Sequence, residues 1–568
     1  MSLYERLSTS HGGRRNKLML SGCLAFLFIM LFSTKMSSAK RYIYPPTSHI
    51  SRPATINACN DTLYQEACVS ALVSSTTSVL QKTPMELFDL SVQFSKGRAQ
   101  SARALAVRAL AHSLSSQMNP KGRAHLVIGM NDCIELLDHS LDRLSNVLNR
   151  DKTGFQVDDV QTWLSAALTN QATCMESLQD YKFEVDKGMV VGAAQNLSHF
   201  ISISLALYMS ANTKGVKKNS NLGGGGGRRL LSDRFPDWLS MPERKLLEAS
   251  TEEIGVKVVV AKDGSGTHMS ISEALASLAG DGRSVIYVKA GTYSENLQIP
   301  ASKKNVMLVG DGKGKTVIVG SRNSKDGWTT YKSATVSAIG DGFMARDITI
   351  MNSAGPAKHQ AVALLVGSDK SVIYRCSIIG YQDTLFTHSQ RQFYAETDIY
   401  GTVDFIFGNS AVVFQNCNIY PRKPMSGQKN FITAQGRADP NENTGISIIN
   451  CKITATSDLA PAKSQVKTFL GRPWQAYSRT VIMESFLDDS IHPQGWAPWS
   501  GNFALKSLFY GEYMNSGPGS STSGRVQWPG YHASLATTEA EKFTVGGFIS
   551  GNQWLPATGV PFDAGLHA

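Results

Sequence analysis

The sequence predicts two structural parts, an all-α helical bundle followed by an all-β parallel β-helix. Three observations support this. The chain has 568 residues, too many for one ordinary domain. Up to about residue 210, apolar residues recur at spacings of three and four, which is typical of amphipathic helices. From about residue 256, short β-branched runs separated by Gly, Asn and Asp take over.

Residues 1–40 are typical of a targeting segment. A basic cluster at 14–17 precedes an apolar run at 18–32, which is long for the core of a signal peptide and short for a membrane-spanning helix. Small residues follow, where cleavage would suit. The segment is therefore predicted to be a cleaved signal peptide or an uncleaved signal anchor, and it is the only predicted membrane contact.

Residues 55–210 are predicted to form the bundle. Stretches such as CIELLDHSLDRLSNVL place apolar residues on one helical face, and such helices pack together. Four cysteines in so small a region suggest two disulfides and an oxidising compartment. The cysteines are Cys59, Cys68, Cys133 and Cys174, and two N-x-S/T glycosylation acceptors of the same region are Asn60 and Asn196.

Residues 211–250 are predicted to be a linker. Five consecutive glycines, Gly223 to Gly227, cannot hold regular structure. Two basic sites follow in the same segment, and basic residues beside a flexible glycine tract are accessible to proteases. We therefore expect proteolytic processing here, the alternative being an inert charged hinge. The basic residues are Arg228, Arg229, Arg244 and Lys245.

Residues 251–568 are predicted to form the β-helix. Five runs share a polar residue, then Asp or Cys, then isoleucine: ARDITIMN, YRCSIIGY, AETDIYGT, FQNCNIYP and IINCKITA. Their spacing is mostly 20–30 residues, as in a solenoid whose coils stack Ile and Cys on the coil before. A β-sandwich would need hairpin turns and strict alternation, which are not evident.

Several common chemistries find no support. The net charge is +11, with the excess mostly in the N-terminal half, but no nucleic-acid-binding motif accompanies it. The sequence lacks the G-x-S-x-G of α/β-hydrolases and the H-E-x-x-H of zinc proteases. GDGKGK is glycine-rich but lacks the spacing of a phosphate loop. We therefore expect no catalytic zinc and no phosphate loop.

Two carboxylates stand out between residues 353 and 409. Asp383 and Asp404 are each flanked by apolar or aromatic residues and lie 21 positions apart, about one coil of the solenoid. They are therefore predicted to lie on adjacent rungs of one face, where one can be held ionised and the other protonated. Arg472 would keep one of them ionised. The alternative is a pair of turn-capping aspartates.

The chain resembles a known family over much of its length. The motifs HQAVAL (359–364), YQDTLF (381–386), GTVDFIFG (401–408) and LGRPW (470–474) follow the order and spacing of plant pectin methylesterases over about 256–560. The N-terminal half is similar to the pectin methylesterase inhibitor family, a four-helix bundle. That similarity implies the disulfides Cys59–Cys68 and Cys133–Cys174.

The resemblance also implies a right-handed β-helix and a mechanism for hydrolysing the methyl esters of homogalacturonan that needs no metal and no organic cofactor. Asp404 would be the nucleophile, and Asp383 would donate a proton to methanol and then activate water. Gln360 and Gln382 would stabilise the oxyanion, Arg472 would orient the nucleophile, and substrate would contact Thr330, Gln360, Phe407, Arg472 and Trp474.

Two departures from the family pattern carry predictions. Thr397 stands where many relatives have a cysteine that pairs with the equivalent of Cys417. Cys417 is therefore predicted to be a buried thiol near Cys376 and Cys451, without a disulfide. Phe386 replaces the usual tyrosine, which removes a hydroxyl from the groove and affects substrate preference rather than the reaction.

The resemblance sets the expected partners and the alternatives. We expect secretion to the cell wall, a pectin substrate, a processing protease, a separate inhibitor protein as a further candidate partner, and a monomeric mature enzyme. A polygalacturonase or a pectate lyase would share the fold, and glycosidases also use paired carboxylates. A non-catalytic binding role is the third alternative. The bundle would inhibit its own esterase, inhibit another, or assist folding and secretion.

Overall fold

The computed structural model describes residues 57–75, 82–115, 120–150, 157–179, 185–219, 257–279 and 282–567. All of them belong to one compact unit. The leader at 1–40 and the basic sites of the linker lie outside the described residues. The predictions about targeting and processing therefore stay predictions.

The predicted bundle is present. Helix α4 begins at a capping box, in which the Thr83 N–H donates to Glu86 Oε2 (2.7 Å) and the Glu86 N–H to Thr83 Oγ1 (3.3 Å). Pro84 occupies the first helical turn, where its missing N–H costs nothing. The helices are α3 (Gln65–Ser75), α4 (Pro84–Ser115), α5 (Pro120–Leu148), α6 (Val157–Ser177) and α7 (Val185–Asn219).

Helix α7 continues beyond the predicted start of the linker at residue 211, as far as Asn219. The run of glycines in the predicted linker begins only later, at Gly223. Within the described residues, Lys187–Asn212 is the one stretch that passes a length and hydropathy test for a membrane span, and 61% of its most apolar window is buried. This burial is what the central helix of a bundle requires.

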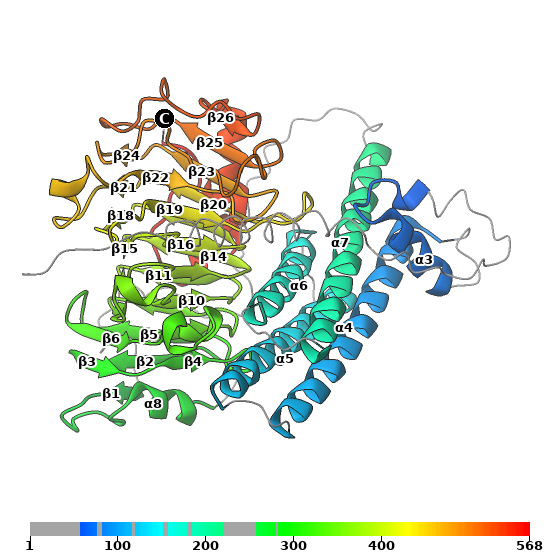
Figure 1. The fold of residues 1–568 in the computed structure, drawn as a ribbon, viewed down its shortest axis with the longest axis horizontal. Coiled ribbons are helices and arrows are strands. Elements are labelled where there is room, and N and C mark those ends of the chain that lie inside the picture. The colour runs from blue at the N-terminus through cyan, green and yellow to red at the C-terminus, as the bar shows by residue number, and fades with distance from the viewer. Residues whose placement is uncertain are drawn as a thin grey trace, which may run out of the picture. The chain divides into compact units, whose positions relative to one another are not determined.

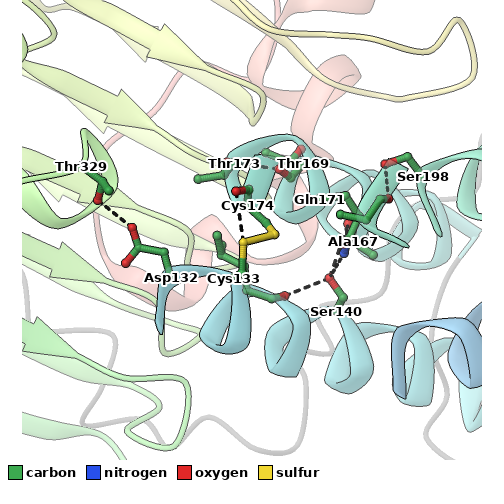
Figure 2. The surroundings of a disulfide bond; sticks show 12 residues. Asp132, Cys133, Ser140, Ala167, Thr169, Gln171, Thr173, Cys174, Ser198 and Thr329 are labelled. Carbon is green, nitrogen blue, oxygen red and sulfur yellow. Dashed lines mark hydrogen bonds between the residues drawn. A yellow bond between two sulfur atoms is a disulfide. The ribbon is translucent and has the colours of Figure 1, made fainter. Parts of the chain in front are cut away.

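Two disulfides fasten the bundle. Cys59 is bonded to Cys68 in α3, and Cys133 of α5 is bonded to Cys174 of α6. Figure 2 shows the second bond between the two helices. It joins chain segments 41 residues apart, so it restricts the unfolded chain as well as fixing α5 against α6.

The C-terminal part is the predicted parallel β-helix. Its strands form three sheets in which every pairing between the described strands is parallel, and successive coils stack from β1 to β26 (Figure 1). The first sheet has 11 strands. They are β1 (Val258–Val260), β2 (Ser284–Val288), β5 (Val306–Gly310), β8 (Met344–Arg346), β11 (Ser371–Tyr374), β14 (Arg391–Ala395), β17 (Ala411–Gln415), β20 (Gly445–Ile449), β23 (Arg479–Met483), β25 (Phe509–Tyr513) and β26 (Tyr531–His532).

The other two sheets have 7 and 8 strands. The 7-stranded sheet contains β4 (Leu297–Ile299), β7 (Val336–Ala338), β10 (Leu364–Val366), β13 (Leu385–Thr387), β16 (Ile406–Gly408), β19 (Asn430–Gln435) and β22 (Thr468–Gly471). The 8-stranded sheet contains β3 (Gly291–Ser294), β6 (Thr316–Gly320), β9 (Thr349–Asn352), β12 (Ser377–Ile379), β15 (Asp398–Gly401), β18 (Asn418–Pro421), β21 (Lys452–Ile453) and β24 (Phe486–Leu487). Short helices α8 (Ile271–Ser277), α9 (Thr537–Ala540) and α10 (Val545–Ile549) complete this part.

An isoleucine ladder explains why the repeated runs form coils. One isoleucine of each run pairs with its equivalent in the next coil, and all of them are fully buried. Burying such a side chain contributes roughly 1.5–3 kcal/mol, and stacking like on like fills the interior without gaps. The ladder consists of Ile350, Ile378, Ile399, Ile419 and Ile453.

One polar residue near the start of each run makes the corner between two sheets. It has a left-handed backbone with φ between 49° and 58°, a conformation that few non-glycine residues adopt. The corner residues are Asp347, Arg375, Glu396, Asn416 and Asn450. The three cysteines Cys376, Cys417 and Cys451 follow such corners, are buried and are free, as predicted.

Candidate active site

The aspartate pair lies on adjacent coils, as the 21-residue spacing predicts. Asp383 precedes β13 and Asp404 precedes β16, and these strands pair with Leu385 opposite Ile406. Both aspartates have left-handed backbones, with φ of 60° and 51°. The Asp383 N–H donates to the Val403 carbonyl (3.0 Å), which joins the two turns. Two buried carboxyl groups thus occupy equivalent positions one coil apart.

Arg472 distinguishes the two aspartates. Its Nε donates to Asp404 Oδ1 (2.8 Å) and its Nη2 to Asp404 Oδ2 (2.5 Å). This paired geometry fixes the carboxylate plane and favours its ionised form. The guanidinium lies between two aromatic rings, at 4.1 Å from the Phe431 centroid and 4.3 Å from that of Trp499. Sequence reasoning singled out neither ring, because neither adjoins a recognised motif.

The electrostatics of the two carboxyl groups differ accordingly. Burial raises the pKa of Asp383 well above its usual range, and the neighbouring charge of Asp404 raises it further. Burial also raises the pKa of Asp404, but Arg472 opposes this shift through its hydrogen bonds and charge. The expected effect of Arg472, which is to keep Asp404 ionised, is thus opposed by burial, and burial shifts the pKa further than Arg472 does. A proton shared by the pair resides on Asp383.

The two glutamines lie beside the pair. Gln360 Oε1 accepts a hydrogen bond from Ser324 Oγ (2.7 Å), which leaves its amide Nε2 as a donor. Gln382 directly precedes Asp383, and its backbone carbonyl accepts from the Ala361 N–H (3.3 Å). Both side chains are half-buried. Backbone hydrogen bonding and strand pairing thus hold the HQAVAL segment (359–364) against the YQDTLF segment (381–386).

A row of aromatic rings runs across the coils next to the aspartates. Phe386 and Phe407 stack at 4.3 Å between centroids, and Trp474 meets Phe407 edge-on at 5.9 Å. Thr330 precedes a short turn of 3-10 helix (Tyr331–Ser333) and is half-buried.

The predicted glycosylation acceptors lie outside this region. Asn60 and Asn196 are exposed on the bundle.

Helix α6 contributes residues to the same region, which sequence reasoning did not find. Thr173 Oγ1 lies 3.0 Å from Nε2 of His388, a buried imidazole whose pKa burial lowers to about 3. Asn409 Nδ2 donates to Thr169 Oγ1 (2.9 Å). The charge of Glu176 is near enough to Asp383 to raise its pKa. No sequence signal could have revealed these contacts, since they join segments more than 200 residues apart.

The aromatic row and the bundle form one apolar cluster. Phe386 and Phe407 are buried in it together with residues of α4 to α7, and Trp474 packs against it. A cavity of about 220 Å³ remains beside them, lined by α6 and α7 residues such as Thr173 and Glu176 and by Phe386, Glu442 and Trp474 of the β-helix part. Within the described ranges, no group of three His, Cys, Asp or Glu could hold a metal ion.

A parallel β-helix that carries a buried aspartate pair, with a paired arginine on one member only, has the architecture of a carbohydrate esterase. The family comparisons agree. Residues 257–552 match the Pectinesterase family model, and residues 54–207 match that of the plant invertase/pectin methylesterase inhibitor family. The chain therefore belongs to the pectinesterase family and is a pectinesterase with an inhibitor-type domain ahead of the catalytic part.

Individual relatives are similar over most of the chain or over its catalytic part. The chain is 60% identical over 480 residues to the probable pectinesterase/pectinesterase inhibitor 35 of Arabidopsis thaliana, covering 84% of this chain and 87% of that protein. It is 48% identical over 511 residues to pectinesterase 2 of Citrus sinensis, covering 89% and 94%. Among solved structures, pectin methylesterase from carrot is 57% identical with a TM-score of 0.55, covering 56% of this chain and all of that one.

Proposed function

We propose that the catalytic part hydrolyses the methyl esters of homogalacturonan through Asp404 and Asp383. One Asp404 oxygen attacks the ester carbonyl, and the amide groups of Gln360 and Gln382 stabilise the resulting oxyanion. Asp383 gives its proton to the departing methoxide, which leaves as methanol. Asp383 then takes a proton from water, which attacks the acyl carbonyl and releases Asp404 and the galacturonate carboxyl.

The observation that carries this assignment is the asymmetry of the pair. Arg472 is paired with the carboxylate of Asp404, which favours the ionised form that a nucleophile needs. Within the part of the chain that the structure describes, Asp383 has no such paired cation, and burial and the charge of Asp404 make it hold its proton more tightly. Such a difference between two neighbouring carboxyl groups identifies the acid and the nucleophile.

The aromatic row would bind the sugar rings. Phe407 and Trp474 offer flat apolar surfaces next to Asp404, and Thr330 would contribute a hydroxyl at the margin of the groove. The substrate partner is pectin, and the mature enzyme acts as a monomer. The setting is the plant cell wall, reached through secretion directed by the leader.

The bundle would hold the esterase inactive until the linker is cut. Helix α6 contacts the coils that carry the aspartates, and the aromatic row is buried against the bundle. A polymer could not reach these rings while the bundle is in place. Cleavage by a protease near Arg228–Arg229 or Arg244–Lys245 would allow release, and a separate inhibitor protein could later occupy the same surface.

The test uses the full chain with a site-specific protease sequence placed between residues 220 and 256. Methanol release from methylated pectin is measured before cutting, after cutting and after removal of the bundle. Methanol without new reducing ends is the expected product, and Asp404→Asn is the inactive control. Reducing ends without methanol would contradict the esterase assignment, and full activity of the uncut chain would contradict inhibition by the bundle.

A further inference from the structure

Beside the ion pair Lys332–Glu135, two ion pairs of opposite polarity join the bundle to the β-helix part. Arg143 of α5 donates to Asp341 through Nη1 (2.8 Å) and Nη2 (2.9 Å). Asp159 of α6 accepts from Nη2 of Arg391 (2.5 Å). In the two pairs of opposite polarity, the bundle supplies one cation and one anion, and the catalytic part supplies the complementary anion and cation. We call Arg143–Asp341 and Asp159–Arg391 the crossed ion pairs.

The catalytic part holds its half of the crossed ion pairs in place. Arg391 donates to Asp369 through Nε (3.0 Å) and Nη2 (2.6 Å). The Asp369 N–H in turn donates to Asp341 Oδ1 (3.0 Å). Although burial opposes ionisation of Asp369, the charge of Arg391 lowers its pKa to about 2. The receiving charges are therefore fixed before a bundle arrives, and no side-chain ordering has to accompany docking.

Three of the four side chains in these pairs are shielded from water, whereas Asp341 is 27% exposed. The Arg391 and Asp159 side chains are 4% and 7% exposed, and Arg143 is 6% exposed. A buried charge that loses its partner is costly, and a like charge placed opposite it is costlier still. The third pair, Lys332–Glu135, lies closer to solvent, with Glu135 37% exposed, so a mismatched charge there is better screened by water. The crossed ion pairs are thus the part of the surface that discriminates between partners.

Building on the proposed function, we propose that the crossed ion pairs determine which catalytic domain the bundle covers. The partner that fits is this chain's own catalytic domain. It presents an acid at 341 opposite the bundle's arginine and an arginine at 391 opposite the bundle's aspartate. A pectinesterase that carries other residues at these two positions is rejected by like-charge or unpaired-charge contacts.

The test is a charge exchange at Arg143 and Asp341 in the full chain with the cleavable linker. After cutting, the affinity of the two pieces is measured by their dissociation on size-exclusion chromatography and by biosensor binding. Arg143→Asp and Asp341→Arg are each expected to weaken binding about 100-fold or more, the range for a broken buried charge pair. The double exchange is expected to restore binding to within about tenfold of wild type. A swapped catalytic piece should also prefer the swapped bundle in direct competition.

Controls separate folding from pairing. The exposed pair Lys463–Asp489 lies within the catalytic part, so Asp489→Arg should leave the affinity unchanged. Methanol release by each isolated catalytic piece reports whether that piece has folded. Arg143→Met alters only the bundle, so it tests the loss of the arginine while the catalytic piece stays unchanged. Failure of the double exchange to recover binding, or wild-type binding by both single variants, would overturn the proposal. Immediate separation of the wild-type pieces would instead overturn coverage by the bundle, and the present proposal with it.

Discussion

Arg472 donates both of its parallel hydrogen bonds to one aspartate, Asp404, at 2.8 and 2.5 Å. The equivalent position one coil earlier, Asp383, shares no such contact. The coils therefore present two chemically different carboxyl groups from a repeating backbone. The difference comes from a single side chain that reaches them from 68 residues further along the sequence.

Arg472→Lys tests this relationship. Lysine keeps the charge but loses the paired geometry, so the pKa of Asp404 should rise and the rate should fall on the order of 100-fold. The acid limb of the kcat/KM profile should move to higher pH, because less Asp404 is ionised at a given pH. The profile is measured by methanol release from the cut enzyme freed of its bundle. Arg375→Lys, at an outlying ion pair with Asp347, serves as the matched control and should leave the profile in place.

Asp383→Asn removes the proton donor while keeping its shape. We expect a loss of about 10²–10⁴ in kcat, the contribution of a positioned general acid. Because the pKa of Asp383 is raised, its proton persists until the pH exceeds that raised value, and the wild-type rate should fall above it. The variant should lack this basic limb. A variant that retained both the rate and the basic limb would remove Asp383 from the mechanism.

The same raised pKa predicts an effect on stability. The folded state binds the Asp383 proton more tightly than the unfolded state, so this group's contribution falls as pH rises from the unfolded pKa towards the folded one. Asp383→Asn should therefore raise the melting temperature at pH 7 but have little effect at pH 4. Thermal unfolding of the uncut chain at both values checks the sign. Equal shifts at the two values would mean that the effect is not electrostatic.

Bundle release should depend on pH. In the docked state, burial raises the pKa of Glu176 to about 8 and that of Asp132 to about 7. Docking thus takes up protons, so the bundle binds most tightly in acid and weakens as pH rises through about 7 to 8. The facing charges are Asp383 at Glu176, and Lys332 and Glu135 at Asp132. The affinity of the cut pieces should drop at least about tenfold between pH 5.5 and pH 8.5.

Glu176→Gln isolates one source of that dependence. The amide cannot ionise, so the variant should bind more tightly at pH 8.5 and about equally at pH 5.5. Glu66→Gln, at an exposed position of α3, is the control of the same chemistry. A pH dependence unchanged by Glu176→Gln would assign it to other groups, with Asp132→Asn as the next variant.

Trp499→Ala tests the aromatic clamp on Arg472. The side chain is 38% exposed and lies 4.3 Å from the guanidinium, a geometry worth roughly 0.5–2 kcal/mol. Removing it should lower kcat about threefold to thirtyfold and shift the acid limb in the same direction as Arg472→Lys. Trp499→Phe should restore most of the activity. A change confined to KM would mean that Trp499 contacts substrate rather than positioning Arg472.

The local repeats determined much of what could be predicted. Ile378, Ile399 and Ile419 recur in runs with a similar residue pattern, and a stacked interior follows from that recurrence. The 21-residue interval between Asp383 and Asp404 matches one coil, so their proximity followed as well. Assigning Arg472 to Asp404 rather than to Asp383 needed the family resemblance, because nothing in the local pattern relates residue 472 to residue 404.

The contacts between the bundle and the β-helix part could not be predicted from local sequence patterns. Thr173, Glu176 and Arg143 look like ordinary polar positions of amphipathic helices. Their significance depends on which face of the bundle meets which coil, and that is decided by tertiary packing alone. The end of α7 was misplaced for a related reason, since the polar residues after 210 carry no helix-breaking signal before the glycines.

The Cys133–Cys174 bond has a consequence for the order of events during synthesis (Figure 2). It ties α5, which carries Arg143, to α6, which carries Asp159, so the docking charges are set in their final spacing once the bundle is oxidised. Helical bundles make mostly local contacts and fold quickly, and N-terminal parts leave the ribosome first. We therefore expect the nascent coils of the β-helix to meet a finished surface, on which the unpaired edges of incomplete sheets are shielded from neighbouring chains.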